Sequence, residues 1–198
     1  MTQSLYQPHS SLQVAERIYQ TSLSGLLYVA QNKHGDARGY FAEVAIIDDL
    51  NTVLETPFHS RQVNLALSQT HVSRGFHREN WNKITTVIQG SAFCCIADLR
   101  PDSQTYKKIE TFVLGESTEA LDGCLYIPKG LGNSYCVLEG PAKYLYLVDA
   151  LYRERDATND QAISLFDPEL AVTWPIARDQ MVISPRDQSA KTIKEIYS

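Results

Sequence analysis

KITTVIQGSAFCCIADL, residues 83–99, contains two apolar runs on either side of the turn signal Gln89-Gly90-Ser91. The runs are rich in β-branched and aromatic residues, which favour strands, and a glycine between such runs marks a turn. We therefore expect two strands, at residues 83–89 and 91–99. The same pattern continues through the middle of the chain and sets the fold class.

Seven further strands are expected on the same grounds. They fall at residues 26–31, 41–46, 61–68, 107–114, 125–127, 134–138 and 142–150. Turn signals such as His34-Gly35-Asp36 and Glu139-Gly140-Pro141 separate them. Many short strands close together in sequence favour an all-β sandwich or jelly-roll barrel, whose interior can hold a ligand at its mouth.

The two ends of the chain have a different pattern. Ser10 and Gln13 have capping-box spacing, and apolar residues such as Ala15 and Ile18 recur at helical intervals, which predicts a helix over residues 10–23. The tail from residue 166 is expected to wrap the barrel and to end in a short helix. The expected units are an N-terminal arm at 1–24, one jelly-roll domain at 25–187 and a tail at 188–198.

Composition excludes several classes of protein. The chain has 198 residues, 43% hydrophobic and 21% charged, which favours one folded domain over disorder. A net charge of −5 argues against a general nucleic-acid binder. No apolar run approaches the ~20 residues that span a bilayer, and the N-terminus does not resemble a secretory signal, so no membrane contact and a cytoplasmic location are expected.

The four cysteines have no metal-binding or redox spacing. Cys94, Cys95, Cys124 and Cys136 contain no C-x-x-C pair, and neighbours on a strand point to opposite faces. We expect reduced thiols in the core or at an interface.

The best candidates for chemistry flank one loop. His77 ends the segment Arg74-Gly75-Phe76-His77 after a predicted strand, and Lys83 returns the chain into the next one. A neutral histidine can take a proton near pH 7, and a lysine nearby can stabilise the resulting oxyanion. The structural alternative is a histidine bonded at a strand end beside a solvated lysine.

A metal site would need His71, His77 and Glu79 to converge. The sequence contains no H-x-H pair, and all five histidines lie at or before residue 77. Because a closed metal site needs three or four ligands, we expect no metal here.

Three tyrosines near the last strand are further candidates. Period-two alternation places Tyr144 and Tyr146 on one face, together with Tyr152 if the strand stays regular. Such phenols are either core fillers with a satisfied hydroxyl or acids and stacking groups in a pocket. Asp187, in Ser184-Pro185-Arg186-Asp187, is by itself an ordinary loop acid.

Taken in order, several segments resemble the dTDP-4-dehydrorhamnose 3,5-epimerase family of the cupin superfamily. The landmarks are Asp36-Ala37-Arg38-Gly39-Tyr40-Phe41-Ala42-Glu43, Gln62-Val63-Asn64, Arg74-Gly75-Phe76-His77, Lys83, Asp98-Leu99-Arg100, Ile127-Pro128-Lys129-Gly130, Asp167-Pro168, Trp174-Pro175 and Ser184-Pro185-Arg186-Asp187. The resemblance runs from about residue 26 to residue 187. No single landmark is specific, but their common order is.

The resemblance implies a jelly-roll homodimer that epimerises a nucleoside-diphosphate 4-keto-6-deoxy sugar without a cofactor. It assigns His77 as the base, Asp187 as the carboxylate that orients it, Lys83 as the group that stabilises the enolate, and Tyr146 as the acid. The residues that it implies for substrate binding are Arg38, Glu43, Gln62, Asn64, Arg74, Asn133 and Tyr152. Arg38 and Arg74 are the expected partners of the diphosphate, because guanidinium groups suit paired phosphate oxygens.

Two departures from the family pattern keep alternatives open. Lys83 follows His77 after an unusually short loop, and Asn133 stands where most members have a histidine. Epimerisation at C3, at C5 or at both is therefore compatible with the chain, as is another nucleotide sugar. A 3,4-ketoisomerase would carry further histidines after Arg74-Gly75, and a non-catalytic sugar-binding cupin would be expected to lose the base or the acid.

Overall fold

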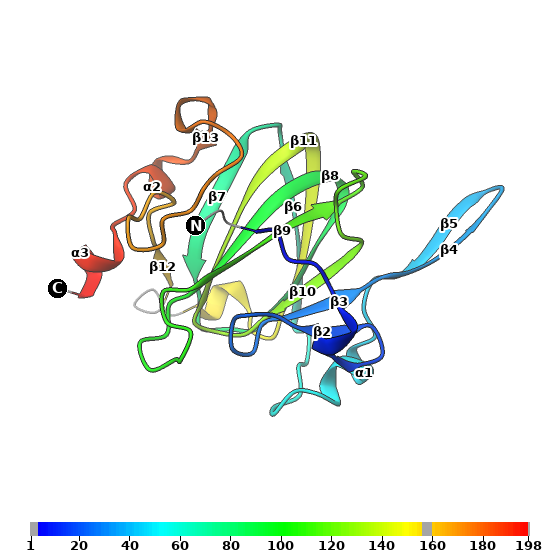
Figure 1. Ribbon diagram of the computed structural model, residues 1–198. Helices are drawn as coiled ribbons and strands as arrows, with labels where there is room; N and C mark the ends of the chain where they lie inside the picture. Colours follow the sequence, from blue (N-terminus) through cyan, green and yellow to red (C-terminus); the bar gives the residue numbers. More distant parts are fainter. Residues whose placement is uncertain (1–3, 156–159, 198) are drawn as a thin grey trace.

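The structure is a computed structural model that describes residues 4–155 and 160–197, and it is mostly β (Figure 1). The longest strands are β8 (Lys83–Asp98) and β11 (Leu131–Val148), which pair antiparallel along their whole length. The other strands of the main sheet are β1 (Gln13–Ala15), β2 (Ile18–Gln20), β3 (Leu27–Ala30), β6 (Gln62–Ser68), β7 (Val72–Arg78), β9 (Ile109–Gly115), β10 (Gly123–Ile127), β12 (Gln161–Ala162) and β13 (Val182–Ile183). The expected jelly-roll class is confirmed.

Strands β8 and β11 each take part in two groups of strands. The first half of β8 and the second half of β11 lie in the strand order β3-β10-β8-β11-β6. The second half of β8 and the first half of β11 lie in the strand order β9-β8-β11-β7. The two strands expected on either side of Gly90 are therefore one strand with a bend, and so are those on either side of Gly140. Gly90 has φ +73°, and a Cβ there would lie 2.4 Å from the Glu139 carbonyl oxygen, so only glycine fits the bend.

Strand β7 was not expected, because its sequence VSRGFHR is short, polar and interrupted by glycine. It places Arg74-Gly75-Phe76-His77 inside the sheet and not in a loop. Residues Arg74 and His77 lie opposite Tyr135 and Asn133 of β11. A Cβ on Gly75 would come within 2.5 Å of the Asn133 carbonyl oxygen, so this glycine allows the two strands to approach.

The helix expected over residues 10–23 is wrong. Only Ser10–Leu12 form a short 3-10 turn (η1), and β1 and β2 then extend the main sheet through β3. Ile18 is buried opposite Val29, so sheet pairing outweighs the local helical spacing. The short helix expected in the tail is confirmed as α3 (Ile193–Tyr197), which follows η3 (Arg178–Gln180) and α2 (Pro185–Gln188).

Buried hydrophobic side chains between the strands form the core. Its largest cluster includes Phe112, Leu125 and Tyr144. The four cysteines are free and buried, as expected, and burial raises the pKa of the Cys124 thiol to about 12. None of the helices described is long and apolar enough to span a bilayer.

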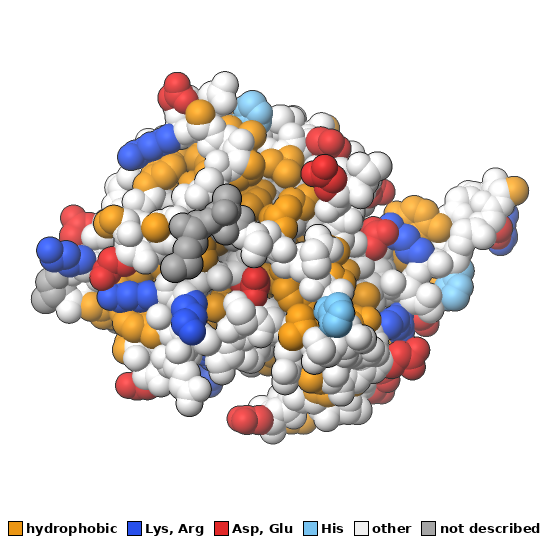
Figure 2. Space-filling view, viewed as in Figure 1, with side chains coloured by type: hydrophobic (Ala, Val, Ile, Leu, Met, Phe, Trp, Pro, Cys, Tyr) orange, Lys and Arg blue, Asp and Glu red, His pale blue; other side chains and the backbone are white. Residues whose placement is uncertain are grey.

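A separate two-stranded hairpin extends from the body. It consists of β4 (Asn32–Asp36) and β5 (Gly39–Glu43), followed by the short helix α1 (Ile47–Asn51). The hairpin projects from the body in the ribbon and space-filling views (Figures 1 and 2), and Lys33 pairs with Asp122 of the body. Tyr40 and Phe41 on it are 58% and 67% exposed, although aromatic side chains usually pack.

Candidate active site

A cavity of about 250 Å³ opens where β7, β8 and both halves of β11 meet. It is lined by Ala66, Arg74, His77, Glu79, Lys83, Asn133, Tyr135, Tyr144, Tyr146, Tyr152, Asp160 and Arg186. Six residues singled out in the sequence for chemistry or binding thus share one cavity: His77, Lys83, Tyr146, Arg74, Asn133 and Tyr152.

His77 forms a pair with a buried carboxylate. Its Nε2 lies 2.8 Å from Oδ1 of Asp187, which is 5% exposed. Asp187 lies in the first turn of α2, where its backbone N–H donates to the side chain of the N-cap residue Ser184. The second carboxylate oxygen accepts from the Gly75 N–H at 3.3 Å. Although burial alone would raise the pKa of Asp187, the hydrogen bond and charge of His77 hold it below the ordinary value. Asp187 is therefore ionised near pH 7.

Lys83 also has a carboxylate partner. It is the first residue of β8, is only 4% exposed and contacts Glu79, four positions earlier in the chain. No sequence pattern pairs these two residues, and Glu79 is predicted from the sequence only as a possible metal ligand. Across residues 4–155 and 160–197, no three His, Cys, Asp or Glu side chains gather as a metal site.

Tyr144, Tyr146 and Tyr152 come to the cavity from two different parts of the chain. Tyr144 and Tyr146 alternate with Leu145 along β11 and face the same side, as expected. Burial raises the pKa of Tyr146, and the charge of Glu79 raises it further. Tyr152 lies beyond the strand, in η2 (Tyr152–Glu154), where its hydroxyl accepts a hydrogen bond from Arg155 at 2.6 Å.

The remaining residues expected to bind substrate lie at different places. On β6, the Gln62 side-chain amide donates a hydrogen bond to the side-chain oxygen of Asn64 at 2.6 Å. The Gln62 side-chain oxygen accepts a hydrogen bond from the Tyr152 N–H at 2.8 Å. The hairpin carries the other two residues, away from this cavity. Arg38 is highly exposed and paired with Asp36, while Glu43 contacts Asn32 and Arg17.

Two charged residues of the cavity were missed in the sequence. Arg186 immediately precedes Asp187, so the motif that carries the carboxylate could have indicated it. Asp160 had no such signal. Its carboxylate, which is 7% exposed, bridges Arg155 at 3.0 Å and Arg186 at 2.9 Å and holds both guanidinium groups near the cavity mouth.

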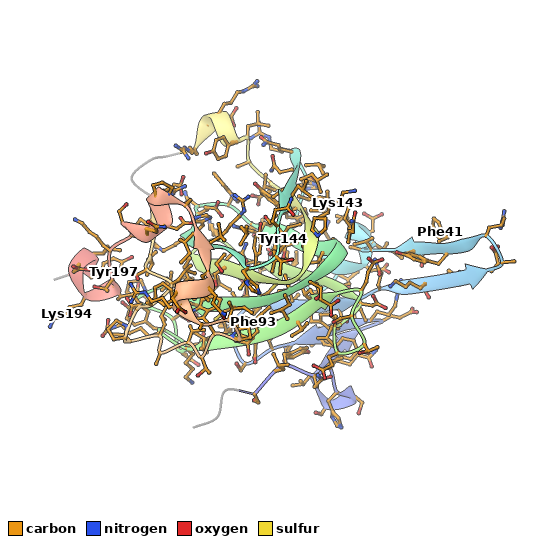
Figure 3. The ribbon with its side chains drawn as sticks, turned by 90° about the horizontal axis from the view of Figure 1, so that it is seen from above. Phe41, Phe93, Lys143, Tyr144, Lys194 and Tyr197 are labelled. Atoms are coloured by element: carbon orange, nitrogen blue, oxygen red, sulfur yellow. The ribbon has the colours of Figure 1, made fainter. Side chains whose placement is uncertain are left out.

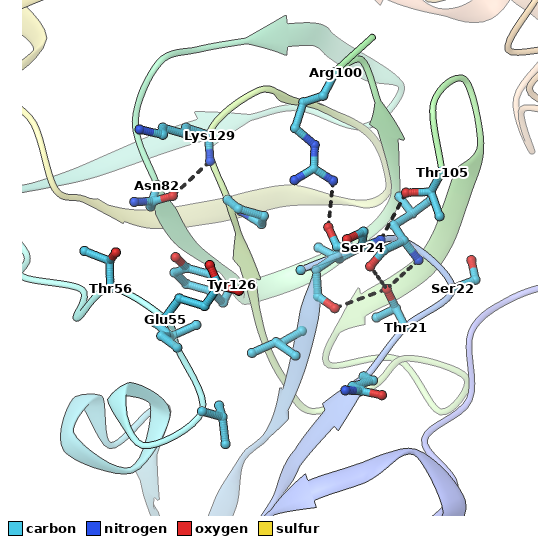
Figure 4. Close-up of a pocket in the computed structure, with 18 of the residues that line it drawn as sticks. Thr21, Ser22, Ser24, Glu55, Thr56, Asn82, Arg100, Thr105, Tyr126 and Lys129 are labelled. Carbon is cyan, nitrogen blue, oxygen red and sulfur yellow. Dashed lines mark hydrogen bonds between the residues drawn. The ribbon is translucent and has the colours of Figure 1, made fainter. Parts of the chain in front are cut away.

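A larger cavity, of about 750 Å³, lies between the N-terminal strands and the turn after β8 (Figure 4). Hydroxyl and amide groups line it, and its Arg100 is already held by Asp98 and by the Ser24 carbonyl oxygen. No histidine lines it, so it lacks a base that is neutral near pH 7. The smaller cavity is the candidate active site.

Comparison with known proteins identifies the family of the chain. The family model described as dTDP-4-dehydrorhamnose 3,5-epimerase matches residues 20–195. The chain belongs to this family. Membership confirms that it is an epimerase.

Named relatives and solved structures cover most of the chain. A dTDP-4-dehydrorhamnose 3,5-epimerase of Methanothermobacter thermautotrophicus is 30% identical over 90% of this chain and 95% of its own. A dTDP-4-dehydrorhamnose 3-epimerase of Streptomyces niveus is 28% identical over 90% and 84%. A 4-keto-6-deoxy sugar epimerase from the novobiocin gene cluster of Streptomyces spheroides superimposes with a TM-score of 0.82 at 26% identity, covering 98% of this chain and 92% of that one.

Proposed function

We propose that the protein inverts a nucleoside-diphosphate 4-keto-6-deoxy sugar at a carbon next to its ketone, with His77 as the base. The observation that carries this proposal is the His77–Asp187 pair, whose histidine lines the same cavity as Lys83 and Tyr146. A ketone at C4 acidifies the hydrogens at C3 and C5, so this chemistry needs a base, a group that stabilises the enolate oxygen, and an acid on the opposite face.

The base is prepared by its carboxylate. With Asp187 ionised, His77 donates its Nε2 hydrogen to Oδ1, and the Nδ1 lone pair is left to take the proton from carbon. The electron pair of the broken C–H bond moves to the C4 oxygen and gives an enolate. Asp187 then stabilises the imidazolium that has formed.

The reverse transfer completes the inversion. The Tyr146 hydroxyl gives its proton to the same carbon from the other face, and the electron pair of the enolate forms the new C–H bond. Burial and Glu79 keep this phenol protonated near pH 7. Solvent then returns a proton to Tyr146 and removes one from His77, so the enzyme is regenerated. Lys83 and Asn133 are the proposed hydrogen-bond donors to the enolate oxygen.

We propose that Arg74 and Arg186 bind the diphosphate, with Arg38 supplied by a second copy of the chain. A homodimer is supported by an exposed apolar row on β6, where Val63, Leu65 and Leu67 are 61%, 57% and 55% exposed. The exposed aromatic residues of the hairpin support it as well. The free, buried cysteines support a cytoplasmic location, because reducing compartments keep thiols unpaired.

Incubation with dTDP-4-keto-6-deoxyglucose in deuterated water tests the reaction. Deuterium at C3, at C5 or at both, together with inverted sugar, is the expected result and defines which carbons react. Migration of the ketone to C3 would identify a 3,4-ketoisomerase. Binding without exchange would identify a sugar-nucleotide-binding protein, and either result would refute the proposal.

A further inference from the structure

Asn133 has a fixed partner on one side of its amide group. It lies opposite His77 in the β7–β11 register and lines the cavity. Its Oδ1 accepts a hydrogen bond from the Tyr144 hydroxyl at 3.3 Å, whereas no side chain of residues 4–155 or 160–197 accepts one from its Nδ2. The amide oxygen is therefore turned toward Tyr144, and the two amide hydrogens are turned away from it.

Tyr144 is itself held rigidly. It is 3% exposed, and its ring stacks on that of Tyr135 with centroids 4.3 Å apart and planes 11° apart. The Tyr135 hydroxyl bonds to Ser68 at 3.1 Å, and Ser68 accepts from the Nε of Arg74 at 3.2 Å. Figure 3 shows Tyr144 within the strands of the body, in contrast to Phe41 on the hairpin. The hydroxyl that faces Asn133 thus has little freedom to move.

The direction of an asparagine amide decides what it does to an enolate. Its NH₂ end donates hydrogen bonds, but a half-turn of the amide presents the carbonyl oxygen, which repels a negative oxygen. A phenol hydroxyl that donates to Oδ1 favours the first orientation, because its hydrogen is then accepted by the amide oxygen. The buried Thr85 side chain lies against the same phenol hydroxyl, and its own hydroxyl can donate to the phenol oxygen, which leaves the phenol hydrogen for Oδ1.

We propose that Tyr144 is a positioning residue that holds the Asn133 amide with its NH₂ group toward the ketone oxygen of the substrate. The inference rests on the proposed function of the cavity and adds to it a residue that does not itself touch the reacting atoms.

A double-mutant cycle tests this role. The four proteins are wild type, Tyr144→Phe, Asn133→Ala and the double variant, and the single-turnover rate of deuterium incorporation into dTDP-4-keto-6-deoxyglucose is measured for each. Tyr144→Phe is expected to lower the rate about tenfold in the presence of Asn133, which is less than the ~10²–10³-fold loss on removing an oxyanion donor outright. In the Asn133→Ala background it should change the rate by less than about twofold. Equal losses in both backgrounds, or no loss in either, would show that Tyr144 does not act through Asn133.

A second measurement needs no substrate. In ¹⁵N-labelled protein the side-chain amide signal of Asn133, identified by its loss in Asn133→Ala, is expected to shift on Tyr144→Phe. An unchanged signal would overturn the inference.

Tyr28→Phe is the matched control, because Tyr28 is also a buried tyrosine, 2% exposed, and donates to the Asp122 carbonyl oxygen at 2.8 Å. It should leave both the exchange rate and the Asn133 signal unchanged.

The two measurements also separate this inference from the proposed function. If wild type does not exchange hydrogen in any 4-keto sugar nucleotide, the proposed function fails, and the action of Tyr144 on an enolate donor fails with it. If wild type exchanges hydrogen and the cycle shows no coupling, only the inference fails.

Discussion

Two basic side chains that line the cavity, His77 and Lys83, are each paired with a carboxylate, and the two pairs are built in opposite ways. His77 and Asp187 are 110 residues apart and meet through the fold, whereas Glu79 and Lys83 are four residues apart and meet within one short loop. In the proposed reaction the histidine of the first pair takes up a proton from carbon, so positive charge grows beside Asp187. The lysine of the second pair takes up no proton in that reaction and donates a hydrogen bond to the enolate oxygen.

This difference predicts opposite effects of the two carboxylates on catalysis. Asp187 lies beside a charge that grows as the proton is transferred, so it stabilises the transition state more than the ground state. Glu79 lies beside a charge that must stabilise a growing negative oxygen, so it weakens that stabilisation. Under the proposed mechanism we therefore expect the first carboxylate to speed the chemical step, and the second to slow it while keeping Lys83 in place.

The largest effect is expected at the base. His77→Ala should lower hydrogen exchange by about 10²–10⁴-fold, the usual consequence of losing a positioned general base. His71 lies at the start of β7 and does not line the cavity, so His71→Ala should retain much of the wild-type rate. Single-turnover exchange in deuterated water compares the two variants, and equal rates in them would remove the base assignment.

Replacement of Tyr146 should separate the two proton transfers. Tyr146→Phe keeps the ring and removes the hydroxyl, so His77 should still form the enolate while inverted product falls by about 10²–10⁴-fold. Deuterium content and product configuration, measured on the same sample, distinguish exchange from inversion. Normal inversion would point to Tyr152, whose hydroxyl is bonded to Arg155, as the acid.

The two enolate donors should contribute unequally. Lys83→Met is expected to cost about 10²–10³-fold in the chemical step, as for loss of an oxyanion donor. Asn133→Ala should cost less, because a charged donor contributes roughly twice as much as a neutral one. Single-turnover rates are needed, since slow product release would mask a chemical defect. A greater loss in Asn133→Ala would show that Lys83 binds phosphate or holds the loop.

Glu79→Gln tests the comparison between the two pairs directly. It keeps the size of the side chain and removes its charge, so the enolate should form a few times faster if Lys83 stays in place. Asp187→Asn is the matched change on the other pair and should slow the reaction. A loss of activity in both variants would mean that Glu79 is needed to position Lys83 and that its charge does not oppose the enolate.

The sequence predicted the strands with strong β-branched and aromatic runs, but not the features that depend on contacts between distant segments. Strand β7 was not predicted because Arg74, Gly75 and His77 interrupt the run of β-branched and aromatic residues. It nevertheless forms, because it pairs with β11 in the sheet. The helix over residues 10–23 was predicted from local spacing, which pairing of β2 with β3 overrides.

The parts of the candidate site that depend on contacts between distant segments were likewise not predictable from the sequence. His77 and Lys83 could be proposed from their residue types and spacing, whereas Asp187 came only through the family resemblance. The Tyr144–Asn133 bond and the Glu79–Lys83 contact join side chains whose orientation depends on the bend in β11 and on the loop after β7. No sequence pattern reports those orientations.

The smallest expected effect concerns stability in acid and again separates the two pairs. The pKa of Asp187 in the folded protein lies below 3.8, the ordinary value that the unfolded chain has, despite the burial that opposes this. Well above 3.8 the carboxyl is ionised in both states, so its full contribution to the free energy of unfolding is present. As pH falls below that value the unfolded chain takes up a proton first, and the contribution disappears as pH passes through the folded pKa. Asp187→Asn should therefore lose less stability than wild type between about pH 5 and about pH 2, measured by urea unfolding at each pH. Equal slopes in this range would show that the His77–Asp187 pair does not stabilise the folded protein and that its importance is confined to the reaction.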